Sequence, residues 1–284
     1  MSSSPKKKGL LDLLFKSRAA KPGETYGVPG QGDTIWLSVL TVVVLLAVWW
    51  VVTAAGLVKP LFVPSPGAII DKFVTIWTKG FTGTPMWEHI AISAARVFGA
   101  FLLACVIGIP LGLAMGMTPA IRGIFDPIIE FYRPIPPLAY LPLMIIWFGI
   151  GETSKVLLIF LSVFAPVALG ARAGVKSAAI EQIHAVYSMG ATRRQVLMRV
   201  ILPSAMPEIL TAMRIGIGFG WTTLVAAEMV AATKGIGYMV LTASQFLQTS
   251  TVIMGIIVIA AIAYAFDMLM RWIERKLLPW KGKM

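Results

Sequence analysis

Long apolar segments are the feature that most constrains the fold of this chain. Six such runs are placed provisionally at Ile35–Ala55, Val97–Met117, Leu138–Ile150, Val156–Val175, Met206–Ala231 and Val252–Met270. All except the third approach or exceed the roughly 20 residues with which a helix crosses the hydrocarbon core of a bilayer. Only 13% of the 284 residues are charged, whereas a soluble domain carries about 25%. We therefore predict an all-α polytopic membrane protein with about six transmembrane helices.

The distribution of positive charge predicts the topology. The formal net charge is +12, but with the N-terminus inside the cell 18 of the 25 Lys and Arg residues fall on one side of the membrane and 5 on the other. This asymmetry follows the positive-inside rule and places both termini and the loop before the fifth span in the cytosol. The basic balance is then a topology signal, and we expect no nucleic-acid partner.

The same pattern divides the chain into three parts. Residues 1–34 are predicted to be a cytosolic N-terminal tail, residues 35–270 the transmembrane domain with a loop at 176–205, and residues 271–284 a cytosolic C-terminal tail. In the first tail three lysines precede the sequence LLDLLF, which is compatible with a short amphipathic helix on the membrane surface. A disordered tail is the alternative, because several Pro and Gly residues follow.

The longest polar interruption, Ile183–Pro203, is predicted to form two short helices. Glu181–Met189 forms the first, and Gly190 supplies a turn because a residue without Cβ reaches conformations that bend a chain sharply. Thr192 and Gln195 have the spacing of a capping box, which starts a second helix.

This second helix is predicted to have two different faces. Its apolar stripe faces its own protein and consists of Val196, Leu197, Val200 and Ile201. Its basic rim faces a partner and consists of Arg193, Arg194 and Arg199. Pro203 is predicted to end the helix. A solvated helix pair without a partner is the alternative interpretation.

The same loop resembles a known motif. Gly190, Val200, Leu202 and Pro203 are spaced as in the EAA loop of the membrane subunits of binding-protein-dependent ABC importers. The opening of that motif is His184, Ala185 and Val186 here, so only the central alanine matches. In that family the loop is a coupling helix that sits in a groove of a cytosolic ATPase subunit.

The resemblance implies a type I ABC importer permease fold with a cytosolic coupling helix. The residues that it assigns to ATPase coupling are His184, Ala185, Gly190, Ala191, Thr192, Arg193, Arg194, Leu202 and Pro203.

The third apolar segment is interrupted by proline. Four prolines, at 134, 136, 137 and 142, cannot all lie in one continuous helix. The backbone groups that they free need partners in the protein or in a water-lined cavity. Pro137 and Pro142 are therefore candidates for the wall of a translocation pathway, and an ordinary kinked helix is the alternative.

A more specific resemblance covers the chain from about Pro64 to Trp280. Together with the proline-rich segment, the sequences GWTTLVAAE and LLPW are similar to those of permeases for taurine and other alkanesulfonates, with nitrate and bicarbonate permeases as near relatives. The resemblance implies a bacterial inner-membrane importer. Its implied partners are two copies of an ATP-binding subunit, a second permease copy and a periplasmic binding protein that delivers the substrate.

The fifth apolar segment carries three ionisable residues, Glu208 in its first turn and Arg214 and Glu228 further along the span. Ionisable groups within a predicted span favour a functional role. Arg214 and Glu228 lie 14 residues apart, about 21 Å along one helix face. The predicted pathway residues in this span are Arg214, Trp221, Thr222, Thr223 and Glu228. The structural alternative is that Arg214 extends toward the cytosol and Glu228 caps the outer helix end.

Two further charged positions are predicted to be structural. Arg96 lies at the outer edge of the second span and is expected to extend toward the interface, with a role in substrate binding as the alternative. Asp267 and Arg271 have the i, i+4 spacing of an ion pair on one helix face.

Missing motifs narrow the function further. The sequence contains no GxxxxGK[ST] loop for binding nucleotide phosphates. We therefore predict that this chain is not an enzyme and binds no cofactor, and that ATP and Mg²⁺ bind to the partner ATPase. Its two histidines, His89 and His184, have no neighbour at metal-ligand spacing. We therefore predict a permease subunit of an ATP-driven importer for taurine or a related alkanesulfonate. The alternatives are a nitrate or bicarbonate permease and a self-contained secondary transporter.

Overall fold

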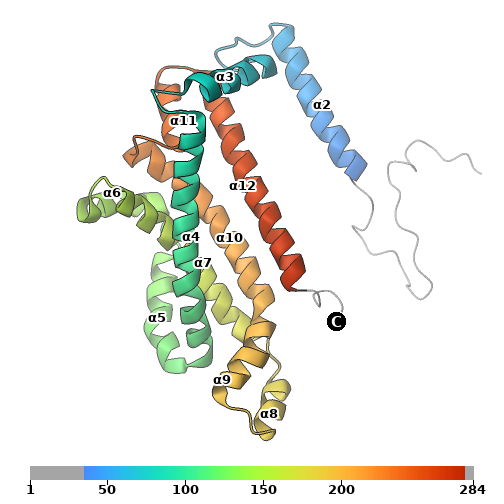
Figure 1. Cartoon of the computed structure of the whole chain (residues 1–284), viewed down its shortest axis with the longest axis vertical. Helices are drawn as coiled ribbons and strands as arrows, with labels where there is room; N and C mark the ends of the chain where they lie inside the picture. Colours follow the sequence, from blue (N-terminus) through green and yellow to red (C-terminus); the bar gives the residue numbers. More distant parts are fainter. Residues whose placement is uncertain (1–34, 279–284) are drawn as a thin grey trace, which may run out of the picture. The chain divides into compact units, whose positions relative to one another are not determined.

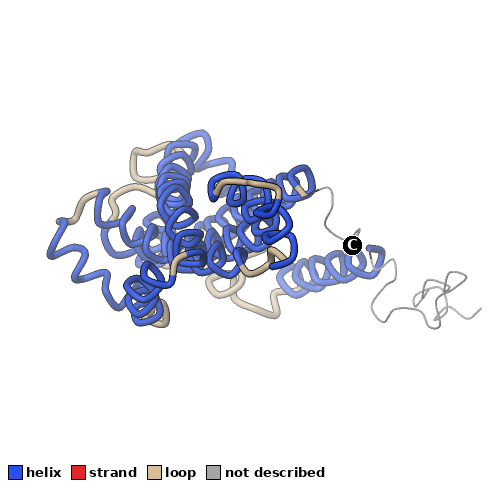
Figure 2. The backbone as a smooth tube through the Cα atoms, turned by 90° about the horizontal axis from the view of Figure 1, so that it is seen from below, coloured by secondary structure: helices blue, strands red, loops and turns tan. Residues whose placement is uncertain are grey.

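The computed structural model of the protein describes residues 35–278. The predicted N-terminal tail, with its possible amphipathic segment, and most of the predicted C-terminal tail after Leu278 lie outside the described residues. The described part forms helices and loops, with one isolated bridge between Phe81 and Thr84 and no β-strand (Figure 2).

The helices follow one another along the chain (Figure 1). They are α2 (Ile35–Ala54), α3 (Pro66–Lys79), α4 (Met86–Met117), α5 (Pro119–Tyr132), α6 (Pro137–Phe148), α7 (Glu152–Val175), α8 (Ile180–Ser188), α9 (Arg193–Val196), α10 (Leu202–Ala231), α11 (Ile236–Gln245) and α12 (Thr249–Leu277). A π-helical turn, Leu197–Ile201, joins α9 to α10.

The chain divides into two compact units after Ala68. The first unit contains α2. The indole Nε1 of Trp49 on this helix donates a hydrogen bond to the Pro64 carbonyl at 3.2 Å. At the start of α3 the Ser65 hydroxyl accepts from the Ala68 amide at 3.3 Å. Serine before a first-turn proline is a favourable start for a helix, and this contact is the corresponding N-terminal cap.

In the second unit α7 packs along both α4 and α10. Small residues permit this packing, as is common between membrane helices. A Cβ atom on Gly112 of α4 would lie 2.2 Å from the Ala168 carbonyl oxygen of α7, and one on Gly170 of α7 would lie 2.1 Å from Cβ of Ala212 on α10. The three helix backbones therefore approach closely at these two positions.

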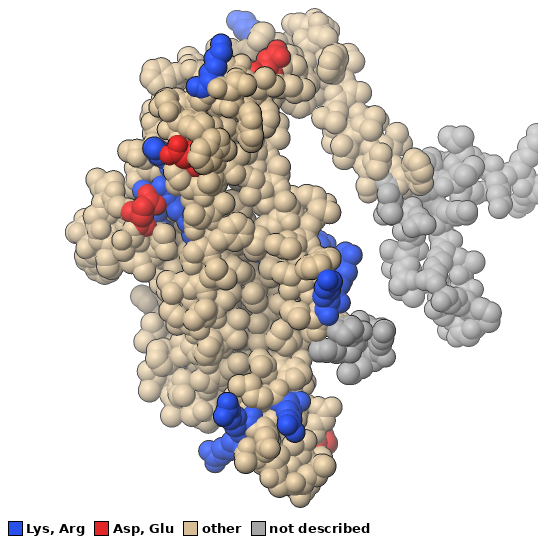
Figure 3. All heavy atoms as spheres, viewed as in Figure 1, with Lys and Arg blue, Asp and Glu red and all other residues tan. Residues whose placement is uncertain are grey.

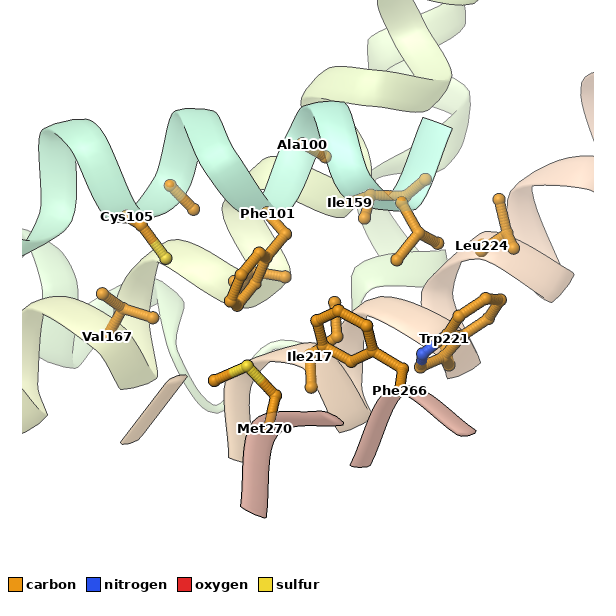
Figure 4. Close-up of a cluster of buried hydrophobic side chains, with 13 residues drawn as sticks. Ala100, Phe101, Cys105, Ile159, Val167, Ile217, Trp221, Leu224, Phe266 and Met270 are labelled. Atoms are coloured by element: carbon orange, nitrogen blue, oxygen red, sulfur yellow. The ribbon is translucent and has the colours of Figure 1, made fainter. Parts of the chain in front are cut away.

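An apolar core fills the space between these helices and α12. Figure 4 shows Phe101 of α4, Ile159 of α7, Trp221 of α10 and Phe266 of α12 converging in this cluster. The Phe101 and Phe266 rings meet edge to face, with centroids 5.7 Å apart. Trp221, predicted to line a pathway, is buried in this core.

Within residues 35–278, five helical stretches are long and apolar enough to cross a membrane. They are Trp36–Ala54, Met86–Met117, Glu152–Val175, Arg193–Ala231 and Thr249–Leu277. The third predicted segment becomes α6, which has only 12 residues. At about 1.5 Å per residue it is roughly 18 Å long, shorter than the roughly 30 Å hydrocarbon core.

The prediction that Pro203 ends a helix was wrong. The chain stays helical from α9 through the π-helical turn into α10, and Pro203 lies in the first turn of α10. Proline is tolerated there because the π-helical turn just before it interrupts the regular hydrogen-bond pattern of the α-helix. The helix of the fifth span correspondingly begins before the predicted Met206, which lies inside α10.

Charged side chains form separate groups on the surface of the second unit (Figure 3). In this view Lys and Arg lie over the end that carries α8 and α9 and, as a further group, near the C-terminal end of α12, and charges of both signs appear toward the end that carries α11. Most of the remaining surface in this view shows no charged side chain.

Candidate functional site

The segment formed by α8, its turn and α9 protrudes beyond the end of α10 (Figure 1). Gly190 has φ of +81° in the turn, which confirms the conformation expected of glycine there. The predicted capping box is present: the Thr192 hydroxyl accepts from the Gln195 amide at 3.3 Å, and the Gln195 side chain accepts from the Thr192 amide at 2.7 Å.

A small apolar cluster fixes this α8–α9 segment to the end of α7. Val196 and Ile201 are buried together with Ala178, while Ile183 and Val186 pack against them. Part of the predicted apolar stripe thus faces its own protein. The segment is held by few residues, so most of its surface stays outside the core.

The outer surface of the segment contains most of the predicted coupling residues. His184, Ala185, Gly190, Thr192, Arg193 and Arg194 are exposed, whereas Ala191, Leu202 and Pro203 are half-buried. Met189, beside the turn, is 84% exposed, and Tyr187 is 44% exposed. Among the described residues no ion pair involves Arg193 or Arg194. This surface combines apolar side chains with unpaired positive charge.

A second polar region lies where α10 ends and α11 begins. Glu228 is fully buried, and its carboxylate accepts from the Ser93 hydroxyl at 2.7 Å, from Arg96 Nη1 at 2.7 Å and from the Gly237 amide at 2.8 Å. Arg96 also forms a two-bond pair with Glu152, with both distances 2.6 Å. Buried charge is tolerable here because each ionic group has several partners.

This Glu228 network consists of His89, Ser93, Arg96, Glu152, Lys155, Glu228 and the backbone of residues 234–237. His89, Ser93 and Arg96 follow each other at i, i+4 and i+7 on α4, so one helix face contacts the α10–α11 turn. Arg96 Nη1 donates to the Lys234 carbonyl at 2.8 Å, and Ser93 accepts from the Ile236 amide at 2.9 Å. The network therefore fixes the turn against α4.

The expectation that Arg96 extends to the membrane interface was wrong. Its side chain is only 5% exposed, because Glu152, Glu228 and a backbone carbonyl supply acceptors inside the protein. Sequence reasoning also missed Ser93 and His89 as members of the network. Their helical spacing on α4 was the available signal, but nothing local identified the partner.

Arg214, another predicted pathway residue, is held by α12. Its guanidinium contacts Asp267 at 3.2 Å and Glu274 at 3.3 Å. Asp267 also pairs with Arg271 at 2.7 Å, which confirms the predicted i, i+4 ion pair. Arg214 therefore joins α10 to α12 rather than extending away from the protein.

A cavity of about 650 Å³ lies between the proline-rich turn after α5, α6, α7 and α10. We call it the α7–α10 cavity. Pro137 lines it, as do Arg133, Tyr140 and Glu208, none of which the sequence singled out as a pathway residue. Pro142 and Thr222 are exposed and Thr223 is buried, and none of the three is among the lining residues. The sequence thus located one wall of the cavity but not its charged groups.

No metal site is evident in residues 35–278: no group of three His, Cys, Asp or Glu side chains is placed to hold an ion. The lone Cys105 is buried in the apolar core.

The helical fold and the five candidate spans of the described residues indicate a polytopic helical membrane protein. Residues 108–279 match the family of binding-protein-dependent transport system inner membrane components. The chain belongs to this family of ABC importer permeases.

Two curated relatives extend this assignment. The taurine transport system permease protein TauC of Escherichia coli (strain K12) is 55% identical over 250 residues, covering 88% of this chain and 91% of that protein. A permease protein of Bacillus subtilis (strain 168), named for aliphatic sulfonates transport, is 34% identical and covers 89% and 91%.

Solved structures support the fold. The inward-facing MetNI methionine ABC transporter matches with a TM-score of 0.59 at 19% identity, covering 68% of this chain and 97% of that chain. At this identity the likeness concerns the fold alone.

Proposed function

We propose that this chain is the permease of an ATP-driven importer that moves taurine or a related alkanesulfonate across the bacterial inner membrane. The observation that carries the proposal is the 55% identity to a taurine permease over 88% of the chain. In this proposal a periplasmic binding protein delivers the substrate and a second copy of the permease completes the pathway. ATP and Mg²⁺ bind to a separate cytosolic subunit, and this chain binds no cofactor.

The α8–α9 segment is the proposed docking surface for that ATPase. Interfaces are enriched in Met, Tyr and Arg, and all three are present here in exposed positions. Met189 supplies an apolar side chain that is 84% exposed, and Arg193 and Arg194 supply positive charge. The Val196–Ile201 cluster ties the segment to α7, and the helix continues into α10. A displacement of the segment would therefore reach two spans of the bundle.

The charge distribution supports the proposed orientation. In the proposed orientation, which the positive-inside rule favours, both termini and the α8–α9 segment are cytosolic, where an ATPase has access to nucleotide. The Glu228 network then lies toward the opposite side, where a binding protein docks.

A reconstituted transporter tests this proposal. Proteoliposomes that contain the chain, its co-purified ATPase and a taurine-binding protein should accumulate taurine only with internal-side ATP. Arg193→Glu should reduce substrate-stimulated ATP hydrolysis about tenfold or more, because a charge reversal at a docked surface opposes the partner. The substitution should leave the fold intact, since an acidic residue is favourable in the first turn of a helix.

Arg275→Glu is the matched control. Arg275 is an exposed arginine in the last turn of α12, on the side proposed to be cytosolic but outside the α8–α9 segment. It should retain near-normal stimulation. Uptake of taurine by the chain alone, driven by a proton or sodium gradient, would instead support a secondary transporter, and uptake of bicarbonate rather than taurine would shift the substrate class.

A further inference from the structure

The α7–α10 cavity has the size of a small-molecule site. Its volume of about 650 Å³ falls within the range of about 300 to 1,000 Å³ that is usual for ligand pockets. Its wall is mainly apolar, with Leu161, Ala165 and Leu169 from α7 and Ile215 and Phe219 from α10. A small solute fits here together with several water molecules.

Two oppositely charged side chains line this apolar cavity. Arg133 follows α5 and Glu208 lies in the second turn of α10. Arg133 is 55% exposed, and its contact with Glu130 is long, at 3.6 Å. Within the described residues no ion pair involves Glu208. Both groups are therefore available to a ligand, in contrast to Arg96, whose acceptors all lie within 2.8 Å.

The packing places the two charges toward different ends of the same wall. The Tyr132 hydroxyl donates to the Leu161 carbonyl at 3.4 Å, which puts the end of α5 beside that turn of α7. At the other end, a Cβ atom on Gly170 would lie 3.5 Å from the Glu208 carbonyl oxygen. Leu161 and Gly170 are nine residues apart, about 13 Å along α7. Long side chains from both ends can reach a solute between them.

A backbone acceptor lies on the same wall. Pro166, inside α7, has no N–H, so the carbonyl of Ser162 lacks its usual helical donor. Ser162 and Pro166 both line the cavity. This carbonyl lies one residue from Leu161, at the Arg133 end of the wall, and can accept a hydrogen bond from a water molecule in the cavity.

We propose that the α7–α10 cavity binds a zwitterionic sulfonate during its passage, with Arg133 holding the sulfonate and Glu208 the ammonium group. A guanidinium matches an oxyanion with two parallel hydrogen bonds, and a carboxylate matches an ammonium. This inference rests on the proposed function and adds a discrimination to it: the cavity favours an aminosulfonate such as taurine over ethanesulfonate, which lacks the amine.

Site-specific labelling tests the inference without transport. Cys105 is the only cysteine and is buried, so Thr211→Cys in a Cys105→Ala background reports on the cavity. In the full-length chain in lipid nanodiscs, millimolar taurine should slow thiol labelling of this variant at least threefold, and ethanesulfonate should protect much less. Thr222→Cys, on the same helix but outside the lining, should show no protection by either solute.

Charge variants then separate the two contacts. Glu208→Gln should raise the taurine concentration for half-protection roughly tenfold or more, because a hydrogen bond to a charged group is lost, and should leave the weak effect of ethanesulfonate unchanged. Arg133→Gln should weaken protection by both solutes. Equal protection of both cysteine variants, or protection insensitive to Glu208→Gln, would overturn the inference.

These experiments distinguish a failure of the cavity assignment from a failure of the proposed transport function. If reconstituted transporter accumulates taurine but taurine never protects Thr211→Cys, the cavity assignment fails while the function stands. If taurine protects as expected but no ATP-driven uptake occurs, the site stands and the importer proposal fails.

Discussion

The charged side chains near the two ends of α10 differ in burial and in pairing. Near Ala231 the ionic side chains of the Glu228 network are paired within the chain, and Glu228 is fully buried. At the other end Arg193 and Arg194 are exposed, and no ion pair among the described residues involves them. Burying a charge is costly unless it is paired, whereas an exposed charge remains hydrated. The charges near Glu228 therefore stabilise the fold, whereas Arg193 and Arg194 are available to a partner.

Each end also contains a glycine at positive φ, and the two surroundings differ. Gly235 has φ of +128°, and a Cβ atom there would lie 2.4 Å from a Glu228 carboxylate oxygen. Gly190 has φ of +81°, and a Cβ atom there would meet nothing within 4 Å. The same residue type thus serves close packing at one end and only a turn at the other.

The largest effect is expected from Glu228→Ala. It removes one carboxylate from buried Arg96 and leaves the Gly237 amide and Ser93 hydroxyl without this acceptor. Breaking a buried pair in this way costs about 3 to 5 kcal/mol. Thermal unfolding in detergent, followed by tryptophan fluorescence, should show a marked decrease of the midpoint or a loss of folded protein.

Two variants keep this prediction decisive. Glu228→Gln retains the shape and one acceptor, so it should fold and give an intermediate midpoint. Glu181→Ala on α8 removes an exposed carboxylate for which the described residues show no ion pair, and it should unfold like the parent protein. Equal thermal unfolding midpoints for Glu181→Ala and Glu228→Ala would show that the buried carboxylate stabilises the protein no more than the exposed one.

A smaller loss is expected from Gly235→Ala. The backbone there adopts a conformation that is almost restricted to glycine, at a cost of about 1 to 3 kcal/mol for other residues. The added methyl group also meets the Glu228 carboxylate, which is fixed by its hydrogen bonds. We expect about 3 kcal/mol in total, measured by denaturant unfolding in mixed micelles. A midpoint equal to that of the parent would mean that the α10–α11 turn moves freely on α4.

Gly190→Ala is the matched substitution at the opposite end. No atom opposes the methyl group, so only the left-handed conformation contributes, about 1 to 2 kcal/mol. Because the α8–α9 segment has a small core of its own, this cost should appear as faster proteolysis within the segment, with little change of the global unfolding midpoint. A global effect as large as that of Gly235→Ala would show that the segment is integral to the bundle.

The difference between the two ends also explains what the sequence predicted. The Gly190 turn, the Thr192 and Gln195 capping box and the Asp267–Arg271 pair depend on neighbours within four residues, so their spacing is visible in the sequence. The apolar spans are visible for the same reason, because each is defined by its own composition.

The Glu228 network was not predictable in this way. Arg96 and Glu228 are 132 residues apart and Arg96 and Glu152 are 56 apart, and only the packing of α4, α7 and α10 brings them together. The charged groups of the α7–α10 cavity were missed for the same reason. The π-helical turn that continues the chain past Pro203 was missed because proline in a first turn and proline at a helix end look alike in sequence.

The smallest effect is expected from Thr192→Ala, which removes the hydroxyl that caps α9. Loss of a threonine cap costs about 1 kcal/mol, and this cost should remain within the α8–α9 segment because Thr192 is exposed. Hydrogen exchange of the Gln195 amide, which loses its acceptor, should accelerate about fivefold, as 1 kcal/mol implies. Ser188→Ala provides the comparison within the same segment, since the Ser188 hydroxyl donates only to the Ala185 carbonyl and caps no amide. If both variants left exchange at Gln195 unchanged, contacts other than the capping box would be holding α9 in place, and the segment would resemble the Glu228 end more than its exposed surface indicates.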